Sequence, residues 1–505
     1  MESTSVAATG AAPGEKGLKR NAIGYLSNVV IGVASTAPGY SLAATLGFIV
    51  AVAGVGLQAP AILLVSFVPM LFIATAYRYM NRADPDAGTT FAWVTRAMGP
   101  RLGWIGGWAI VVADIIVMAN LAAIAGSYSF LLFGWDSAAA STAAVTAIGV
   151  VWIVIMTYIC YVGIELSART QRYLLSAEVL TLAAFAIVAF IKVYANDPAG
   201  SLHVSASWFN PFAIHSWSAL TDGVLLGLFI YWGWDSGVAV NEESQDPARG
   251  PGKAAVVSTV VLLVIYLVVS AAAQSYGGPK LLIDNADDVL SVLGGKVFPF
   301  PLDRLLIIAV LTSAAASTQT TILPTARTTL SMARWGAMPK ALGQVHREHL
   351  TPHVSTILMG AVSIVWYVVM TILSQNILAD SIVALGLMIA FYYGITGFAC
   401  AIFYRRELTR SAKNFLLAGV VPTLGGLMLL GIFVKALTFY GKPANATSSF
   451  LGVGSPVVIG IGALILGLVL MLVSHGTHRD FFRRKTEVAK PGLLEEPATA
   501  APTSG

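Results

Sequence analysis

Acidic side chains lie inside three of the long apolar stretches of this sequence, where an ionisable group is costly. Asp114, Glu178 and Asp235 each fall within a stretch that is rich enough in apolar residues to cross a membrane. Ionisable groups at membrane depth usually face a water-filled path or bind an ion, a proton or a charged solute. These three carboxylates are therefore the first candidates for chemistry in this chain.

Two apolar stretches are interrupted in the middle by residues that weaken a helix. The first contains the run Ser35-Thr36-Ala37-Pro38-Gly39, and the second contains Tyr231-Trp232-Gly233-Trp234-Asp235. Proline removes a backbone donor and glycine is a poor helix former. Unwound backbone at membrane depth is tolerated only where protein or water satisfies its polar groups. Both interruptions are therefore candidate binding elements.

The composition places most of the chain in a lipid bilayer. Of the 505 residues, 56% are hydrophobic and 11% are charged, whereas soluble domains carry about 25% charged residues. So few charges cannot cover the surface of a soluble protein of this length. The two cysteines, Cys160 and Cys400, lie inside apolar runs and are interpreted as packing residues, because their spacing fits neither a disulfide framework nor a metal motif.

Stretches of about 20 mostly apolar residues predict twelve membrane-spanning helices. Their approximate bounds are 25–50, 57–79, 103–133, 144–164, 173–194, 217–240, 254–275, 303–333, 352–374, 378–404, 414–438 and 451–474. With the amino terminus in the cytoplasm, the 30 Lys and Arg residues all fall on the cytoplasmic side except Lys192, Lys280, Lys296, Arg304, Lys435 and Lys442. Cytoplasmic loops are enriched in Lys and Arg, so both termini are predicted to be cytoplasmic and the protein to lie in the cell membrane.

The two interrupted helices, 25–50 and 217–240, are five helices apart. Because five is odd, helices 1–5 and 6–10 would run in opposite directions, as in the inverted repeats of transporters. Short helices are expected at corresponding places, over 89–98 and 284–293. The predicted fold is thus an all-α membrane protein with a five-plus-five inverted repeat and two further carboxy-terminal helices, in which helices 1 and 6 are unwound. Its predicted parts are a disordered amino terminus 1–20, a first repeat 21–215, an inverted second repeat 216–405, helices 11 and 12 within 406–475, and a disordered cytoplasmic tail 476–505.

Three stretches resemble the amino acid–polyamine–organocation superfamily, and specifically its prokaryotic amino acid permeases. They are residues 85–93, residues 229–249 with an aromatic-glycine-aromatic-acid run followed by Glu-Glu and acid-Pro-x-Arg, and residues 327–339. With the helix pattern, the likeness covers about residues 20–475. It implies a LeuT-like fold that works by alternating access around helices 1 and 6. Family members usually show Gly-Ser/Thr-Gly-Ile at the break in helix 1, which this sequence lacks.

An amino acid is a zwitterion, so its site needs groups for a carboxylate and for an ammonium. The half-helix that begins near Pro38 would present N–H groups and the positive end of a dipole to the carboxylate, and the exposed carbonyls of residues 33–35 and 230–233 suit the ammonium. The aromatic residues of the second break would cover the substrate side chain, with ordinary helix packing as the alternative. The residues expected to bind substrate are Ser35, Thr36, Ala37, Gly39, Tyr40, Ser41, Asp114, Tyr231, Trp232, Gly233, Trp234 and Asp235.

Glu178 is expected to carry a coupling proton. Against the family, it falls where some proton-coupled permeases carry a lysine in place of a sodium ion. Ser317 and Thr318 resemble the hydroxyl pair that lines the same ion site. The alternative role for Glu178 is a structural carboxylate bonded to a neighbouring helix. Two alternative roles are also open for the Asp235 carboxylate: it shapes the helix break, or it binds a cationic group.

The remaining acids and histidines are assigned to ion pairs at the membrane ends and to a solvated loop. Glu165, Glu242 and Glu243 lie near membrane ends and are expected to pair with an arginine, namely Arg169, Arg172 or Arg249. The histidines at 346, 349 and 353 are interpreted as part of a solvated loop rather than a metal site, because no further ligands converge on them.

The sequence predicts a secondary active transporter that takes up amino acids with protons. The alternative is a polyamine or potassium importer in which Asp114, Glu178 and Asp235 coordinate the cation. A membrane enzyme is disfavoured, since the spans contain no zinc spacing and no Gly-x-Ser-x-Gly elbow. A channel is disfavoured because two broken helices in an inverted repeat are typical of a transporter. The expected partners are a small-molecule substrate and membrane lipid, with no nucleic acid, no cofactor beyond a proton gradient, and a monomeric or homodimeric state.

Overall fold

The computed structural model describes residues 16–286, 288–373, 375–490 and 492–494, and most of them belong to helices. Within these residues, eleven helical stretches are long and apolar enough to cross a membrane. They are α1 (Tyr25–Ser35) with α2 (Pro38–Ala51), α3 (Ala59–Ala83), α5 (Pro100–Leu132), α7 (Thr142–Val162), α8 (Ile164–Asn196), α11 (Gly250–Asp284), α13 (Leu305–Arg334), α14 (His353–Leu373), α15 (Gln375–Phe403), α17 (Val421–Tyr440) and α18 (Ser455–Thr477). The predicted all-α membrane class is confirmed.

Shorter elements join these spans. The short α-helices are α4 (Thr90–Met98), α6 (Asp136–Ala139), α9 (Trp217–Ile230), α10 (Ser236–Ala239), α12 (Val289–Val297), α16 (Ala412–Asn414) and α19 (Arg479–Phe482). The 3-10 and π turns are η1 (Gly56–Gln58), η2 (Ala206–Phe209), η3 (Pro211–Ala213), η4 (Asn241–Glu243), η5 (Leu302–Arg304), η6 (Lys340–Gly343), η7 (Leu408–Arg410), η8 (Phe415–Val420) and η9 (Pro443–Asn445). Strands β1 (Ser449–Phe450) and β2 (Val453–Gly454) form a small antiparallel pair.

The first interruption lies where the sequence places it. α1 ends at Ser35 and α2 starts at Pro38, with Ala37 between them in the left-handed conformation at φ 50°. Pro38 suits the first turn of α2, because its missing N–H is one that a helix start leaves unpaired anyway.

The second interruption separates α9 from α10. Gly233 lies between the two helices at φ 116°. A Cβ on Gly233 would come within 2.7 Å of the Ser35 carbonyl oxygen, so only glycine lets the two breaks approach this closely. At 14 residues, α9 is too short to span alone, and a twelfth span and the inverted repeat stay predictions.

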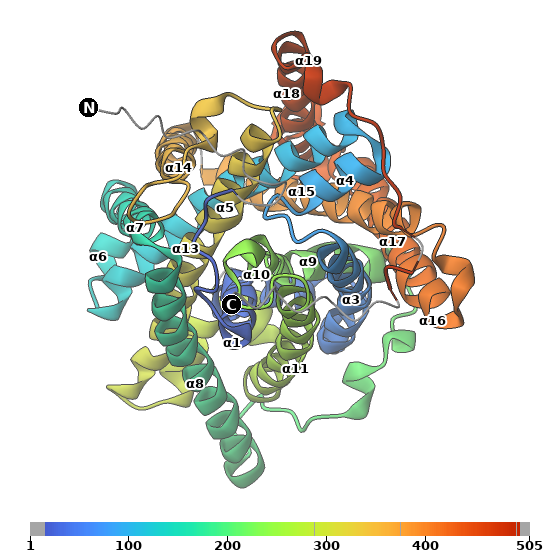
Figure 1. The fold of residues 1–505 in the computed structure, drawn as a ribbon. Helices are drawn as coiled ribbons and strands as arrows, with labels where there is room; N and C mark the ends of the chain where they lie inside the picture. Colours follow the sequence, from blue (N-terminus) through green and yellow to red (C-terminus); the bar gives the residue numbers. More distant parts are fainter. Residues whose placement is uncertain (1–15, 287, 374, 491, 495–505) are drawn as a thin grey trace.

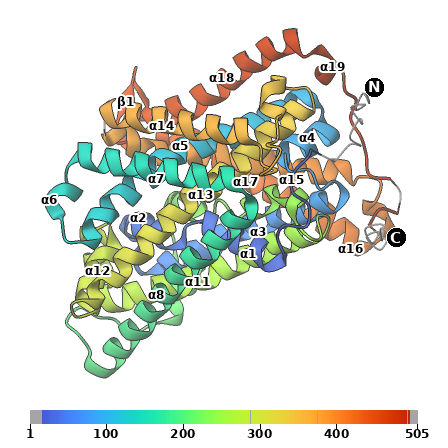
Figure 2. The ribbon, with the colours of Figure 1, turned by 60° about the vertical axis from the view of Figure 1, so that its left-hand side comes forward.

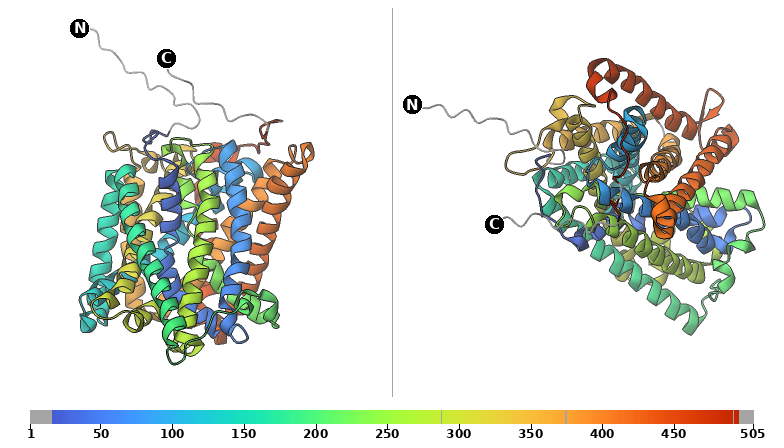
Figure 3. Two further views of the ribbon diagram at one scale, coloured as in Figure 1. Left: turned by 90° about the horizontal axis from the view of Figure 1, so that it is seen from below. Right: turned by 45° about the vertical axis from the view of Figure 1, so that its right-hand side comes forward.

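The two broken helices lie in the middle of the bundle. Figure 1 shows α1 and α10 surrounded by α3, α5, α8, α11 and α13, whereas α18 lies at the periphery in Figures 1 and 2. In Figure 3 the spans stand side by side with similar directions. The most apolar window of the first span is 83% buried and that of α18 is 17% buried. Polar groups in the first span are therefore shielded from lipid, as a binding element requires.

The structure contains a short helix at or near each of the two segments where the sequence predicts one. α4 matches the expected segment 89–98, whereas α12 begins at Val289 because α11 continues as far as Asp284.

Both described chain ends differ from the predicted disorder. Lys16 is only 5% exposed, and Phe481 and Phe482 are buried. The Glu487 N–H donates to the Arg96 carbonyl oxygen at 2.7 Å. The expectation of disorder is therefore wrong where these ends are anchored to the helix bundle by buried residues, namely Lys16, Leu18, Phe481, Phe482 and Ala489. Most other side chains of residues 16–20, 476–490 and 492–494 are exposed, and the remaining terminal residues lie outside the described chain. Composition misled here because few of these residues are apolar, and a few buried apolar side chains, an ion pair and backbone hydrogen bonds hold them.

Candidate functional site

The two helix breaks touch each other through small polar side chains. The Ser35 and Ser236 hydroxyls are 2.8 Å apart, which joins the end of α1 to the start of α10. Ser317 on α13 donates to the Ser35 carbonyl oxygen at 2.9 Å. The carbonyl that ends α1 is thus held by protein, and Ser317, a predicted site residue, lies at the break. Thr318 does not, because its hydroxyl donates within α13 to the Ala314 carbonyl oxygen.

The first N–H groups of α2 are also occupied by side chains. The Gly39 N–H donates to Glu178 Oε1 at 2.7 Å, and the Tyr40 N–H donates to the Ser313 hydroxyl at 3.1 Å. The Ser41 hydroxyl donates to the Thr36 carbonyl oxygen at 2.8 Å. The prediction that these amides stand free for a substrate carboxylate is therefore wrong for the described conformation, because a helix start attracts any anion within reach.

Glu178 projects from α8 onto the start of α2 and is fully buried. One carboxylate oxygen accepts from Gly39, and the other, Oε2, has no hydrogen-bond partner among the described residues. Its neighbouring hydroxyl on α13 is Ser313, which lies four residues before Ser317. Ser313 was not expected from the sequence, although a spacing of four places the two serines on one face of a helix.

Asp235 anchors the second break to α15. Its two oxygens accept from the Tyr393 hydroxyl at 2.8 Å and from the Tyr392 hydroxyl at 3.3 Å. The Trp232 indole donates to the Tyr392 hydroxyl in turn. These contacts match the reading in which Asp235 shapes the helix break. Neither tyrosine was expected from the sequence, where the signal is an adjacent pair of hydroxyl-bearing rings in an apolar span.

Asp114 lies away from the contact between the breaks. Its carboxylate accepts from the Thr325 hydroxyl and so joins α5 to α13. It is 3% exposed and close enough to Asp235 for the two charges to interact. Asp114 therefore lies near Asp235 of the second break, but within the described residues its carboxylate makes no hydrogen bond to the backbone of either break.

Four buried polar atoms beside the breaks have no hydrogen-bond partner within the described chain. They belong to the side chains of Glu178 (Oε2), Tyr40 (hydroxyl), Tyr231 (hydroxyl) and Trp234 (indole N–H). Buried polar groups are normally paired, so each of these atoms marks a place where a polar group of a ligand would be bound. All four were named as site residues from the sequence.

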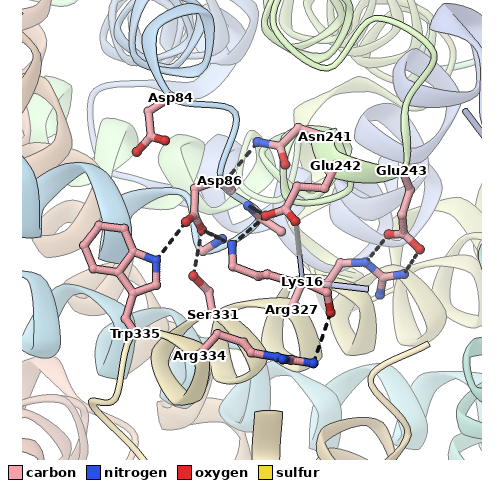
Figure 4. A network of polar contacts seen from close by, with 12 residues as sticks. Lys16, Asp84, Asp86, Asn241, Glu242, Glu243, Arg327, Ser331, Arg334 and Trp335 are labelled. Carbon is pink, nitrogen blue, oxygen red and sulfur yellow. Dashed lines mark hydrogen bonds and ion pairs between the residues drawn. The ribbon is translucent and has the colours of Figure 1, made fainter. Parts of the chain in front are cut away.

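A second polar cluster closes one end of the two breaks, on the side that the charge distribution predicts to be cytoplasmic (Figure 4). The Lys16 amine lies 2.7 Å from Asp86 and 2.5 Å from Glu242. Glu242 also accepts from the Ala87 N–H, and Asp86 from the Ser331 hydroxyl. The Trp335 indole N–H donates to Asp86 Oδ2 at 3.0 Å. We call Lys16, Asp86, Glu242, Ser331 and Trp335 the Lys16 network.

The Lys16 network links parts that are far apart in the sequence. Asp86 follows α3, Glu242 lies in η4 just after the second break, and Ser331 is at the end of α13. Arg334 donates to the Lys16 carbonyl oxygen at 3.3 Å. The stretch from Lys16 to α1 therefore lies across the end of the broken helices, and the expected pairing of Glu242 with Arg169, Arg172 or Arg249 is wrong.

The acids of this region, which lies outside the spans, differ in their proton affinity. Burial disfavours the Lys16 ammonium, but Asp86 and Glu242 outweigh it and raise the pKa of Lys16. Burial opposes charge on Asp86 as well, and Lys16 nevertheless holds the pKa of Asp86 below its usual value. Burial raises the pKa of Glu242 despite Lys16. Burial, together with the charge of Asp86, raises the pKa of Asp84 to about 6 although Arg96 opposes the shift.

Arg327 and Glu243 form a buried ion pair beside the Lys16 network. Two guanidinium nitrogens donate to the two carboxylate oxygens at 2.5 and 2.9 Å, and both side chains are almost fully buried. The Glu243 carbonyl oxygen also accepts the Ala22 N–H at 2.8 Å. This pair fixes α13 to the turn after the second break. The expected pairing of Glu243 with Arg169, Arg172 or Arg249 is therefore wrong, and so is that of Glu165, which pairs with Lys19.

We expect Arg327→Met to destabilise the protein strongly, because it leaves the Glu243 carboxylate buried and unpaired. Breaking a buried pair by removing one partner costs about 3–5 kcal/mol. Thermal unfolding in detergent measures the effect as a lower Tm. The double variant Arg327→Met/Glu243→Met should recover most of the loss, and a single variant as stable as the wild type would contradict the assigned role of the pair.

An all-helical membrane protein with two broken helices meeting around buried polar groups belongs to the class of membrane transporters. A family model described as amino acid permease matches residues 23–474. The chain belongs to the amino acid permease family, so the resemblance seen in the sequence is confirmed. It is a multi-pass membrane transporter rather than an enzyme.

Several curated proteins are similar to this chain over most of its length. An uncharacterized transporter of Mycobacterium tuberculosis is 27% identical over 345 residues, which cover 68% of this chain and 72% of the relative. The branched-chain amino acid permease BcaP of Bacillus subtilis is 23% identical over 70% of this chain and 75% of its own. The low-affinity putrescine importer PlaP of Escherichia coli is 21% identical over 73% and 79%.

Proposed function

We propose that this permease takes up an amino acid together with protons, by alternating access around the two broken helices. The observation that carries the proposal is the position of Glu178. Its buried carboxylate joins α8 to the first N–H of α2, and its second oxygen has no partner in the described chain. Two relatives named as branched-chain amino acid permeases support an amino acid as the substrate.

Glu178 gives a chemical route for coupling. When charged, its carboxylate accepts from Gly39 and is favoured by the dipole at the start of α2. Protonation makes the carboxyl a weaker acceptor, since hydrogen bonds to an ionised partner are about twice as strong. The Gly39 N–H then becomes available to the substrate carboxylate. A proton on Glu178 and an anionic group at α2 would therefore arrive together, which is the requirement for symport.

The remaining unpartnered groups suit the rest of an amino acid. The Tyr40 and Tyr231 hydroxyls accept as well as donate hydrogen bonds and can serve the ammonium, and the aromatic rings can cover an apolar side chain. The carbonyls of Ser35 and Ile230, expected from the sequence to bind the ammonium, are instead held by Ser317 and by the Tyr266 hydroxyl.

Alternating access requires that each side close in turn. The Lys16 network joins both halves of the chain at one end of the breaks, and release on that side requires these contacts to part. The described conformation is in this sense closed on the Lys16 side.

Uptake by purified protein in proteoliposomes tests the proposal. Labelled amino acids are offered in sodium-free buffer with and without an acid-outside pH gradient. We expect accumulation of at least one apolar amino acid that rises with the gradient and collapses with a protonophore. Uptake that is insensitive to the gradient would contradict proton coupling, and absence of uptake for the whole panel would contradict an amino acid substrate.

One observation favours a second candidate, a diamine such as putrescine. The first two N–H groups of α2 are already satisfied by Glu178 and Ser313, while the same buried region holds the carboxylates of Asp114 and Asp235. A substrate with two ammonium groups and no carboxylate fits that charge pattern, and one relative is named as a putrescine importer. Competition separates the candidates: zwitterionic amino acids should block uptake of the first substrate class and leave diamine uptake unchanged.

A further inference from the structure

A cationic cavity lies at the end of α13, on the same side as the Lys16 network. Its volume is about 790 Å³, and the loop between α13 and α14 forms most of its wall. Three cations line it, Arg334, Lys340 and Arg347, and Glu348 is the one acid among its lining residues. None of the three cations has an ion-pair partner within the described chain. The cavity therefore carries a net positive charge that the described protein does not neutralise.

An apolar groove of about 410 Å³ lies between α7 and α14. Val154, Tyr158 and Ile357 line it with more than half of each side chain exposed. The two helices cross closely at its floor, where a Cβ on Gly360 would come within 2.5 Å of the Thr157 hydroxyl. Since these helices lie at the outside of the bundle (Figure 1), the groove faces the hydrocarbon of the bilayer.

The cavity and the groove meet at Tyr161, in the last turn of α7. Tyr161 lines the groove, and its ring contacts the rings of His346 and His349 with centroids 5.5 and 5.3 Å apart. The Thr351 hydroxyl donates to the Tyr161 carbonyl oxygen at 2.8 Å. The loop that walls the cavity is therefore fixed to the end of the helix that walls the groove.

We propose that this composite surface binds an anionic phospholipid. The phosphate-bearing headgroup would occupy the cavity with Arg334, Lys340 and Arg347, and an acyl chain would lie in the groove. The depth matches, because α7 ends and α14 begins at the level of the cavity, where a spanning helix reaches the headgroups. The charge matches as well, since basic pockets at helix ends on the cytoplasmic side suit anionic headgroups and arginine binds phosphate with two N–H groups.

The site has a direct connection to the Lys16 network. Arg334 lines the cavity and also donates to the Lys16 carbonyl oxygen. A bound headgroup would therefore hold the residue that fixes the amino-terminal stretch in place. His346 orders the loop, because its Nδ1 accepts hydrogen bonds from the backbone N–H groups of Glu348 and His349.

Thermal unfolding of the delipidated protein in detergent tests the proposal without any transport measurement. Phosphatidylglycerol, phosphatidylcholine and glycerol phosphate are each titrated, and the rise in Tm gives an apparent affinity. The variant Lys340→Ala/Arg347→Ala spares Arg334 and removes two charges from the cavity. Arg405→Ala/Arg406→Ala removes the same charge from another surface loop and is the matched control. Ala361→Trp fills the groove without changing charge.

We expect phosphatidylglycerol to stabilise the wild type and the Arg405/Arg406 control equally, and far more than phosphatidylcholine does. Affinity should fall roughly tenfold or more in Lys340→Ala/Arg347→Ala, because each basic residue near an anionic headgroup contributes substantially. It should also fall in Ala361→Trp. Equal responses to the two lipids, or an unchanged affinity in the cavity variant, would overturn the proposal. Equal stabilisation by glycerol phosphate would assign the cavity to a soluble phosphate and overturn the lipid.

Discussion

Proton-driven uptake should be lost when Glu178 is replaced by Gln, although the protein should still fold and bind its substrate. The amide oxygen of Gln can accept from the Gly39 N–H, as Glu178 Oε1 does at 2.7 Å, so the attachment of α8 to α2 is retained. What is lost is the ability of this position to bind and release a proton. Accumulation driven by a pH gradient should therefore fall to the level reached without a gradient, because position 178 can no longer carry a proton.

The measurement compares two modes of transport in the same proteoliposomes. Counterflow, in which labelled and unlabelled substrate exchange, requires no net proton movement and should persist in the variant. Glu165→Gln is the matched control, because Glu165 undergoes the same chemical change in an exposed pair with Lys19. Full uptake with an unchanged pH profile in Glu178→Gln would contradict its role as proton carrier. Loss of both modes together with a lower Tm would identify Glu178 as a structural carboxylate.

The parts of this site that could be predicted from sequence are those fixed by local backbone chemistry. Pro38 and Gly233 mark the breaks because their effect on a helix does not depend on what surrounds them, and both breaks lie where expected. Charges inside apolar runs are visible in the same way, which is why Glu178 could be named. The family resemblance rests on similarly local runs of residues.

The partners of those residues could not be predicted, because each comes from a distant helix. Glu178 meets Ser313 and the α2 backbone rather than Ser317 and Thr318. Asp235 is held by two tyrosines about 160 positions later in the chain. In both cases rotation of one helix about its axis decides the contact, and a sequence pattern constrains that rotation only to within a face.

Lys16 lies in a stretch whose composition favours disorder, so its role emerges only from the structure. The contacts of this one amine with Asp86 and Glu242 replace the apolar burial that would otherwise hold the stretch. We expect Lys16→Met to open the Lys16 side of the molecule, because it leaves two buried carboxylates facing each other without a cation. Removing one partner of a buried ion pair costs about 3–5 kcal/mol, which is enough to invert a closed-to-open equilibrium.

Thiol labelling measures this opening directly. The two native cysteines are buried, and a cysteine placed at Val240, which is buried just before the network, reports access from the Lys16 side. Labelling by a charged reagent should accelerate roughly tenfold or more in Lys16→Met. Lys19→Met is the matched control, since Lys19 is exposed and pairs with an exposed acid. Equal labelling rates in both variants would contradict a closing role for Lys16.

The pH dependence of the same labelling has a defined sign. Glu242 and Asp84 have raised pKa values in the closed conformation, that of Asp84 to about 6. A carboxyl whose pKa is higher in the closed state takes up a proton on closing, so acidification favours closure. The raised pKa of Lys16 does not alter this, because the amine is charged in both states throughout the neutral range. The thiolate is the species that reacts, so acidification slows labelling at any cysteine, and the wild-type rate at position 240 is therefore divided by the rate in Lys16→Met. This ratio should fall as the pH falls from 7.5 towards about 6. Glu242→Gln should reduce the slope of this ratio with pH, and a ratio that rises on acidification would contradict closure by protonation of Glu242 and Asp84.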